Sequence, residues 1–199
     1  MASPPLLLLA GLRCSGKTTL GAAVAARLGV AFQDLDTLVL ARLEARSVTE
    51  AWQVHGEAGW RQAEAEALAA HITSGTSGVL SLGGGTPTAP GAAACIRSAQ
   101  AMGHATLALL DPGEDELARR LHAGRGDRPK LGADAAEEVA RLRAGRLPLY
   151  RSMADALIDT RLPESDCVTR LAELLSRGRW PWPSTPASES PRVRSRRGP

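Results

Sequence analysis

The chain has 199 residues, 44% of them hydrophobic and only 3% aromatic, which is typical of one globular domain with a core of Leu, Val and Ala. The formal net charge is +3, but residues 176–199 carry six arginines and one glutamate, which leaves −2 for residues 1–175. This balance does not indicate a basic core that binds nucleic acid, and it favours a solvated, disordered basic tail over a docking arm.

The cysteines and the apolar runs indicate the cellular compartment of the protein. Cys14, Cys95 and Cys167 are widely spaced and form no CxxC pair, so the sequence predicts neither a disulfide framework nor a zinc site. Such cysteine usage favours a reducing compartment. The apolar run at residues 6–10 is too short to cross a membrane and lacks the features of a signal peptide. We therefore expect a cytoplasmic protein with no membrane partner.

Short apolar runs alternate along the chain with longer segments of helical periodicity. Strands are predicted at residues 6–10, 30–32, 79–82, 105–110 and 156–158. Helices are predicted at 18–28, 37–46, from the capping box Ser47-x-x-Glu50, and at 57–72, 90–101, 114–121, 133–144, 148–156 and 164–177. This alternation is typical of a three-layer α/β fold with a parallel sheet and helices on both faces. The domain is expected to span residues 1–177, followed by a disordered Pro/Ser/Arg-rich tail at 178–199.

The first predicted strand ends in a complete phosphate-loop pattern, Gly11-x-x-x-x-Gly16-Lys17-Thr18, and a predicted helix follows it. Glycines let successive backbone N–H groups surround phosphate oxygens, and the helix adds its positive dipole end. Lys17 supplies charge to the β- and γ-phosphates, and the Thr18 hydroxyl is a ligand for Mg²⁺. The sequence therefore predicts a nucleoside triphosphate site, with an ordinary glycine-rich turn as the alternative.

Two acidic segments are candidates for a second contact to the metal. Asp111 follows the apolar run 107–110, but Pro112-Gly113 come next, so a turn-forming or helix-capping role is at least as well supported. Asp34 and Asp36 end the second predicted strand, and on an extended segment their carboxylates share one side. One could then face the metal and the other a substrate hydroxyl. Helix capping is the alternative for both.

Six segments in order resemble the shikimate kinase family, from about Leu6 to Leu175: GLRCSGKTT (11–19), FQDLD (32–36), GEAGWRQAE (56–64), LGGGT (82–86), DRPKL (127–131) and RLPLY (146–150). The resemblance implies a P-loop kinase fold with a mobile lid. It also implies transfer of the γ-phosphoryl group from MgATP to the 3-hydroxyl of shikimate, in the pathway to chorismate and aromatic amino acids. Shikimate and ATP are then the partners, Mg²⁺ is the cofactor, and a monomer is expected.

The resemblance also implies where shikimate binds. Arg61 and Arg146 match the substrate arginines, whose guanidinium forks suit a carboxylate. Asp36 matches the aspartate that binds the ring hydroxyls, where it could orient or deprotonate the attacking one, and Gly83, Gly84 and Gly85 let the backbone approach the substrate. Without the resemblance, Arg61 would be interpreted as a solvated surface residue and Arg146 as a cap of the preceding helix.

The remaining expected site residues bind ATP and the metal. The nucleotide set is Gly11, Cys14, Ser15, Gly16, Lys17, Thr18, Thr19, Arg120, Arg128 and Arg161, with Thr18 and Asp34 at the metal. Lys17, Asp36 and Arg128 are the expected catalytic residues, Arg128 from the lid at 122–131. Lys130 departs from the family, which commonly has leucine there, and the tail after Gly178 matches nothing in the shared fold.

Two other functions stay open at the level of sequence. One is a kinase of similar build that acts on another hydroxy acid, such as gluconate. The other is a nucleotide-binding regulatory module that hydrolyses ATP slowly or not at all. A tail that binds nucleic acid or an acidic partner is a separate alternative.

Overall fold

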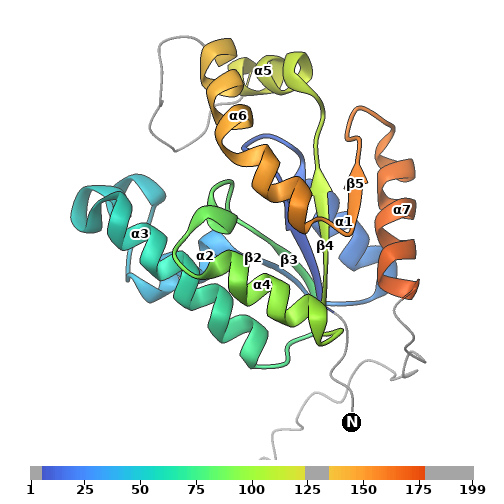
Figure 1. The fold of residues 1–199 in the computed structure, drawn as a ribbon, viewed down its shortest axis with the longest axis horizontal. Coiled ribbons are helices and arrows are strands. Elements are labelled where there is room, and N and C mark those ends of the chain that lie inside the picture. Colours follow the sequence, from blue (N-terminus) through green and yellow to red (C-terminus); the bar gives the residue numbers. More distant parts are fainter. Residues whose placement is uncertain (1–5, 124–134, 178–199) are drawn as a thin grey trace, which may run out of the picture.

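The computed structural model describes residues 6–123 and 135–177, arranged around one parallel sheet with the strand order β2-β3-β1-β4-β5 (Figure 1). The strands are β1 (Leu6–Ala10), β2 (Phe32–Asp34), β3 (Gly78–Ser81), β4 (Ala105–Leu110) and β5 (Ala156–Ile158). The helices are α1 (Lys17–Leu28), α2 (Leu35–Arg42), α3 (Val48–Thr73), α4 (Ala92–Ala101), α5 (Glu114–Ala123), α6 (Ala135–Met153) and α7 (Glu164–Arg177), with a 3₁₀ turn η1 at Thr86–Thr88.

Alternation of side chains along the central strand produces the three layers. All of β1 is buried, and Leu7 and Leu9 pack with residues of α1 and α7. Leu6 and Leu8 belong to the opposite cluster, which contains residues of α2, α3 and α4. Because both faces of the sheet are covered at its centre, the central strand β1 is apolar throughout. The predicted α/β fold with a parallel sheet and helices on both faces is confirmed.

Helix α6 corrects the prediction of two helices at 133–144 and 148–156. The chain is helical from Ala135 to Met153, with Pro148 inside the helix. Tertiary packing overrides the helix-breaking tendency of proline here, because Leu142, Leu147 and Tyr150 are all buried on one side of the helix. Arg146 therefore lies within a helix rather than at a cap.

The long helix α3 agrees with the two predicted segments that it joins. Ser47 caps its start by accepting a hydrogen bond from the Glu50 N–H, at 3.1 Å. Gly56 has φ 67° and ψ 177°, which kinks the helix directly before Glu57.

Among the helices in the described part of the chain, none combines the length and apolar character needed to cross a bilayer.

Several sequence predictions fall on residues that the structure does not describe. Arg128, Lys130 and most of the expected lid lie outside the described residues, as does the tail at 178–199. The roles assigned to them stay predictions.

Candidate active site

The phosphate loop joins β1 to α1, and its backbone requires glycine at both fixed positions. Gly11 has φ 152°, and a Cβ there would lie 2.6 Å from the Leu110 carbonyl oxygen. Gly16 has φ 97° and directly precedes α1. The Lys17 ammonium folds back over the loop and donates to the carbonyl oxygens of Gly11 (2.9 Å) and Leu12 (2.8 Å). A buried ammonium and the free amides of a helix start thus lie together, which suits a polyphosphate.

Asp34 connects this loop to the next strand. Its Oδ2 accepts a hydrogen bond from the Thr18 hydroxyl at 2.9 Å, and its Oδ1 accepts from the Asp36 N–H at 3.0 Å. The side chain of Asp34 therefore caps α2, which is the alternative role predicted for it. It also contacts the expected metal ligand Thr18. Within residues 6–123 and 135–177, no three His, Cys, Asp or Glu side chains gather as a metal site. A divalent cation here would have few protein ligands, as Mg²⁺ has in nucleotide sites.

Asp36 points to a different place from Asp34, which corrects the expectation that both carboxylates share one side of an extended segment. Helix α2 begins at Leu35, so Asp36 lies in its first turn. A Cβ on Gly83 would come within 2.8 Å of Asp36 Oδ1 and within 2.8 Å of Thr86 Oγ1. The carboxylate of Asp36 therefore lies against the glycine turn that follows β3.

Arg61 reaches the same turn from helix α3. Its Nη1 donates to Glu64 Oε2 at 2.6 Å and its Nη2 donates to Glu57 Oε1 at 3.3 Å. Burial lowers the pKa of Arg61, but the two carboxylates outweigh it and the pKa is raised on balance. The other oxygen of Glu64 accepts from the Thr86 hydroxyl at 2.9 Å, and the Glu64 side chain is only 1% exposed. The guanidinium is thus held in a fixed direction.

Each glycine of the turn is needed because another group occupies the space of a side chain. A Cβ on Gly85 would lie 2.6 Å from Arg61 Cζ. The carbonyl oxygen of Gly84 accepts from Arg146 Nη1 (3.0 Å) and from the Tyr150 hydroxyl (2.8 Å). Burial is the main reason that the pKa of Tyr150 is raised to about 12. Asp36, Arg61 and Arg146 therefore converge on three consecutive glycines.

Arg120 lies on the other side of the phosphate loop. Its Nη2 donates to the Thr160 carbonyl oxygen at 2.7 Å, and its Nε donates to Glu116 Oε1 at 2.6 Å. Its Nη1 would lie 3.9 Å from a Cβ on Gly16, so the guanidinium is next to the loop. Arg161 follows Thr160 and forms an exposed ion pair with Asp159, 2.6 Å between Nη2 and Oδ2. Two of the three arginines predicted at the nucleotide, Arg120 and Arg161, lie at this end of the site, and the third, Arg128, lies outside the described residues.

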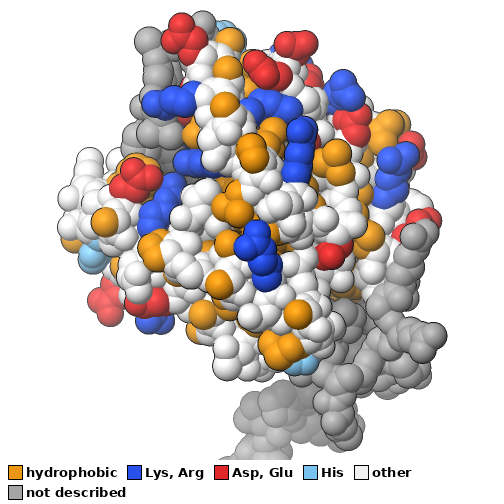
Figure 2. Space-filling model, in the orientation of Figure 1, with side chains coloured by type: hydrophobic (Ala, Val, Ile, Leu, Met, Phe, Trp, Pro, Cys, Tyr) orange, Lys and Arg blue, Asp and Glu red, His pale blue; other side chains and the backbone are white. Residues whose placement is uncertain are grey.

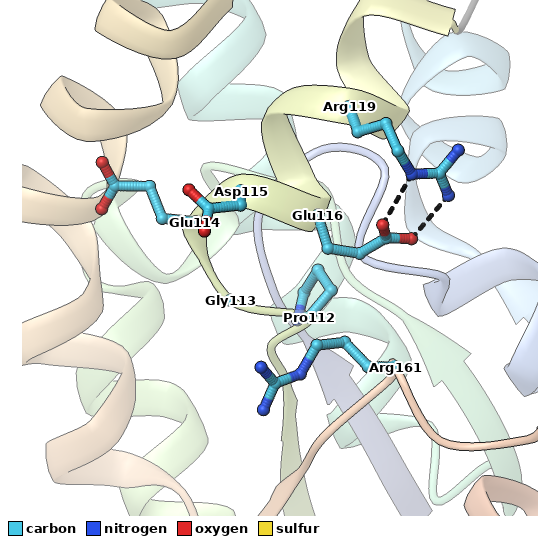
Figure 3. A pocket seen from close by; sticks show the side chains of 7 residues that line it. All are labelled: Pro112, Gly113, Glu114, Asp115, Glu116, Arg119 and Arg161. Carbon is cyan, nitrogen blue, oxygen red and sulfur yellow. Dashed lines mark hydrogen bonds and ion pairs between the residues drawn. The ribbon is translucent and has the colours of Figure 1, made fainter.

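A small pocket of about 260 Å³ opens beside Arg161 at the start of α5 (Figure 3). It is lined by Pro112, Gly113, Glu114, Asp115, Glu116, Arg119 and Arg161. The Arg119 side chain is paired with Glu116, 2.7 Å between Nε and Oε2. Carboxylates outnumber guanidiniums on its walls, so the lining suits a hydrogen-bonding base or ribose better than a phosphate.

Asp111 has a structural role instead of facing the phosphate loop. Its Oδ1 accepts from Arg143 Nη1 at 2.6 Å and from the Gly113 N–H at 3.0 Å. Although burial raises the pKa of Asp111, the hydrogen bonds from Arg143 and Gly113 lower it below its ordinary value. The turn-forming alternative is therefore the one that the structure supports, and the carboxylate also anchors α6.

Sequence reasoning missed three side chains that shape the site: Glu64, Thr86 and Tyr150. Glu64 stands three residues after Arg61, and Tyr150 stands four after Arg146, so each pair shares a helix face. The spacing of three and four residues could therefore have identified Glu64 and Tyr150 as neighbours of the two arginines. In Figure 2, Lys and Arg side chains lie over α5 and α6 and beside α3, interspersed with Asp and Glu side chains.

A phosphate loop that faces an aspartate and two arginines, on a five-stranded parallel sheet, defines a P-loop kinase that acts on small molecules. Residues 13–176 match the family model described as shikimate kinase. The chain is 38% identical over 185 residues to the shikimate kinase of Mycobacterium tuberculosis, covering 92% of this chain and 99% of the relative. The chain therefore belongs to the shikimate kinase family, which confirms the resemblance found in the sequence.

Solved structures agree with this membership. The shikimate kinase of Bacteroides thetaiotaomicron superposes with a TM-score of 0.74 at 29% identity, covering 86% of this chain and 98% of the other. The shikimate kinase of Acinetobacter baumannii in complex with shikimate gives a TM-score of 0.77 at 24% identity, covering 89% and 96%. At that lower identity, the second comparison supports the fold alone.

Proposed function

We propose that the protein transfers the γ-phosphoryl group of ATP to the 3-hydroxyl of shikimate. The observation that carries the proposal is the convergence of Asp36, Arg61 and Arg146 on the Gly83–Gly85 turn, next to the phosphate loop. Membership in the shikimate kinase family, over nearly the whole length of the Mycobacterium tuberculosis relative, supports the choice of acceptor.

The acceptor end of the site suits a small anion with several hydroxyls. Arg61 and Arg146 present guanidinium groups at neighbouring glycines, so together they form a receptor for one carboxylate. Asp36 accepts hydrogen bonds from ring hydroxyls and orients the attacking one. A glycine turn leaves the ring free to lie against the backbone.

The nucleotide end suits a triphosphate with a divalent cation. The Thr18 hydroxyl and the Asp34 carboxylate are hard oxygen donors 2.9 Å apart, which is the chemistry that Mg²⁺ prefers. When bound there, Mg²⁺ neutralises charge on the β- and γ-phosphates. Arg120 and the turn at Thr160-Arg161 border the space for the nucleotide base.

The chain's own residues act by positioning and by charge. Phosphoryl transfer passes through a loose transition state, so alignment and electrostatics contribute more than proton abstraction. Lys17 stabilises the charge on the transferred group, and Asp36 with the two arginines aims the acceptor hydroxyl. Arg128 is assigned the same stabilising role from the resemblance alone.

A coupled assay for ADP across an acceptor panel tests the proposal. We expect ADP to appear with shikimate and not with gluconate or with water alone. Equal ADP release without an acceptor would favour an ATPase or regulatory module, and release with gluconate alone would favour the rival kinase. The exclusive requirement for shikimate is the supporting result.

A further inference from the structure

The phosphate loop contains an arginine, Arg13, to which the proposed reaction assigns no role. Its backbone N would lie 3.2 Å from a Cβ on Gly84, and its Cγ would lie 3.4 Å from the same point. The Gly84 carbonyl oxygen accepts hydrogen bonds from Arg146 and Tyr150 of helix α6. Gly84 is thus in contact with the phosphate loop through Arg13 and with α6 through its carbonyl group.

Arg13 also reaches α6 directly, through Glu138. The distance between Arg13 Nη1 and Glu138 Oε1 is 3.8 Å, and the Glu138 side chain is only 5% exposed. Glu138 Oε1 is buried and accepts no hydrogen bond from the residues that the structure describes. A buried carboxylate is strongly unfavourable without a compensating charge, and among the residues that the structure describes Arg13 forms an ion pair with it.

The position of Glu138 on its helix gives this pair a consequence for the substrate site. Glu138 and Arg146 are eight residues apart on α6, about 12 Å along the axis at 1.5 Å per residue. Because α6 is a continuous helix, holding Glu138 against the phosphate loop also fixes where the Arg146 guanidinium lies. Arg143, between them, is tied to Asp111 at the end of β4.

We propose that Arg13 is a positioning residue for phosphoryl transfer: its ion pair with Glu138 fixes α6, and with it Arg146, relative to the phosphate loop. The inference rests on the proposed function, because it concerns the alignment of the acceptor with the nucleotide. Misalignment of a bound acceptor slows transfer even where nucleotide binding is intact.

The test compares Arg13→Gln, Glu138→Gln and the double variant, by kcat, the KM for shikimate, the KM for ATP and the melting temperature. Each single variant is expected to lower kcat/KM for shikimate by about tenfold, with the KM for ATP changed by less than about twofold. The double variant is expected to match the single ones, because all three remove the same attraction. Arg13→Lys keeps the charge and is expected to retain most of the activity.

Arg42→Gln is the matched control, because it also removes an arginine from an ion pair, with Glu66 on the exposed surface of α2 and α3. It is expected to leave the kinetic constants unchanged. If Arg13→Gln lost activity while Glu138→Gln kept full activity, the proposal would be overturned. Arg13 would then be assigned a direct contact with the reacting groups. The proposal would also be overturned if the double variant lost kcat/KM by the product of the two single losses. A lower melting temperature with unchanged kinetic constants would overturn it too. A wild-type chain inactive towards shikimate would instead refute the proposed function, and this inference with it.

Discussion

Arg61 and Glu64 form a short, nearly buried ion pair, 2.6 Å between Nη1 and Oε2, at the place where Gly85 approaches the guanidinium. The pair is part of a chain of contacts, because the second oxygen of Glu64 accepts from the Thr86 hydroxyl. A guanidinium fixed in this way meets a substrate carboxylate without first losing side-chain entropy.

Glu64→Gln is therefore expected to weaken shikimate binding although Glu64 is not assigned a contact with the substrate. The substitution keeps the size of the side chain but removes the charge that orients Arg61, and we expect a roughly tenfold rise in the dissociation constant. Titration calorimetry measures it. Glu57→Gln is the control, since that carboxylate is 59% exposed and lies 3.3 Å from Arg61. Equal effects of the two variants would contradict the assignment.

Gly85→Ala is expected to impair acceptor binding by displacing Arg61. A methyl group at this position would overlap the guanidinium, at 2.6 Å from Cζ. Gly145→Ala is the matched control, because a Cβ there meets nothing within 4 Å and Gly145 lies inside α6. It is expected to raise the free energy of unfolding by about 0.5–1 kcal/mol with activity intact. Denaturant unfolding and steady-state kinetics check both variants.

The pKa of the Tyr150 hydroxyl is a direct test of how deeply this side chain is buried at the glycine turn. It is the one tyrosine in the 199-residue sequence, so tyrosinate absorbance reports on this side chain alone. Burial raises its pKa from 10.0 to about 12, so the folded protein favours the neutral form. The stability that this provides is fully present below pH 10 and is lost as the pH rises through about 12.

A spectrophotometric titration of the folded chain is expected to give a midpoint near pH 12, and the unfolded chain a midpoint near pH 10. Tyr150→Phe should abolish the absorbance change and remove this part of the alkaline loss of stability. A folded midpoint equal to the unfolded one would show that the hydroxyl is not buried against Gly84.

Asp34→Asn is expected to raise the concentration of Mg²⁺ needed for half-maximal activity. The amide oxygen keeps a cap for α2, whereas the negative charge beside Thr18 is lost. A Mg²⁺ titration at saturating ATP and shikimate measures the change, with the melting temperature recorded alongside. Unchanged dependence on Mg²⁺ would remove Asp34 from the metal site.

Local patterns explain the parts of the fold that were predicted well. The strand at 105–110 and the helix at 164–177 have the predicted bounds, because apolar runs and amphipathic periodicity are properties of neighbouring residues. The phosphate loop was recognised for the same reason. Pro148 shows the limit of such reasoning, because the buried face of α6 keeps the helix intact through a residue that normally ends one.

The geometry of the site could not be predicted from local sequence patterns, because it depends on contacts between residues far apart in the sequence. Arg146 and Gly84 are separated by 62 residues, and Thr18 and Asp34 by 16. The resemblance named most of these residues, but it did not show that the Gly84 carbonyl group joins Arg146 to Tyr150. The directions of Asp34 and Asp36 also depended on where α2 begins, and helix boundaries are poorly determined by sequence.

Paired titrations of wild type and Arg61→Ala, one with shikimate and one with ATP, test most directly that two arginines from distant segments hold the acceptor. The account predicts that Arg61→Ala weakens shikimate binding by at least about tenfold and leaves ATP binding within about twofold. Equal loss of affinity for both ligands would contradict it, because Arg61 would then support the whole fold rather than the acceptor site.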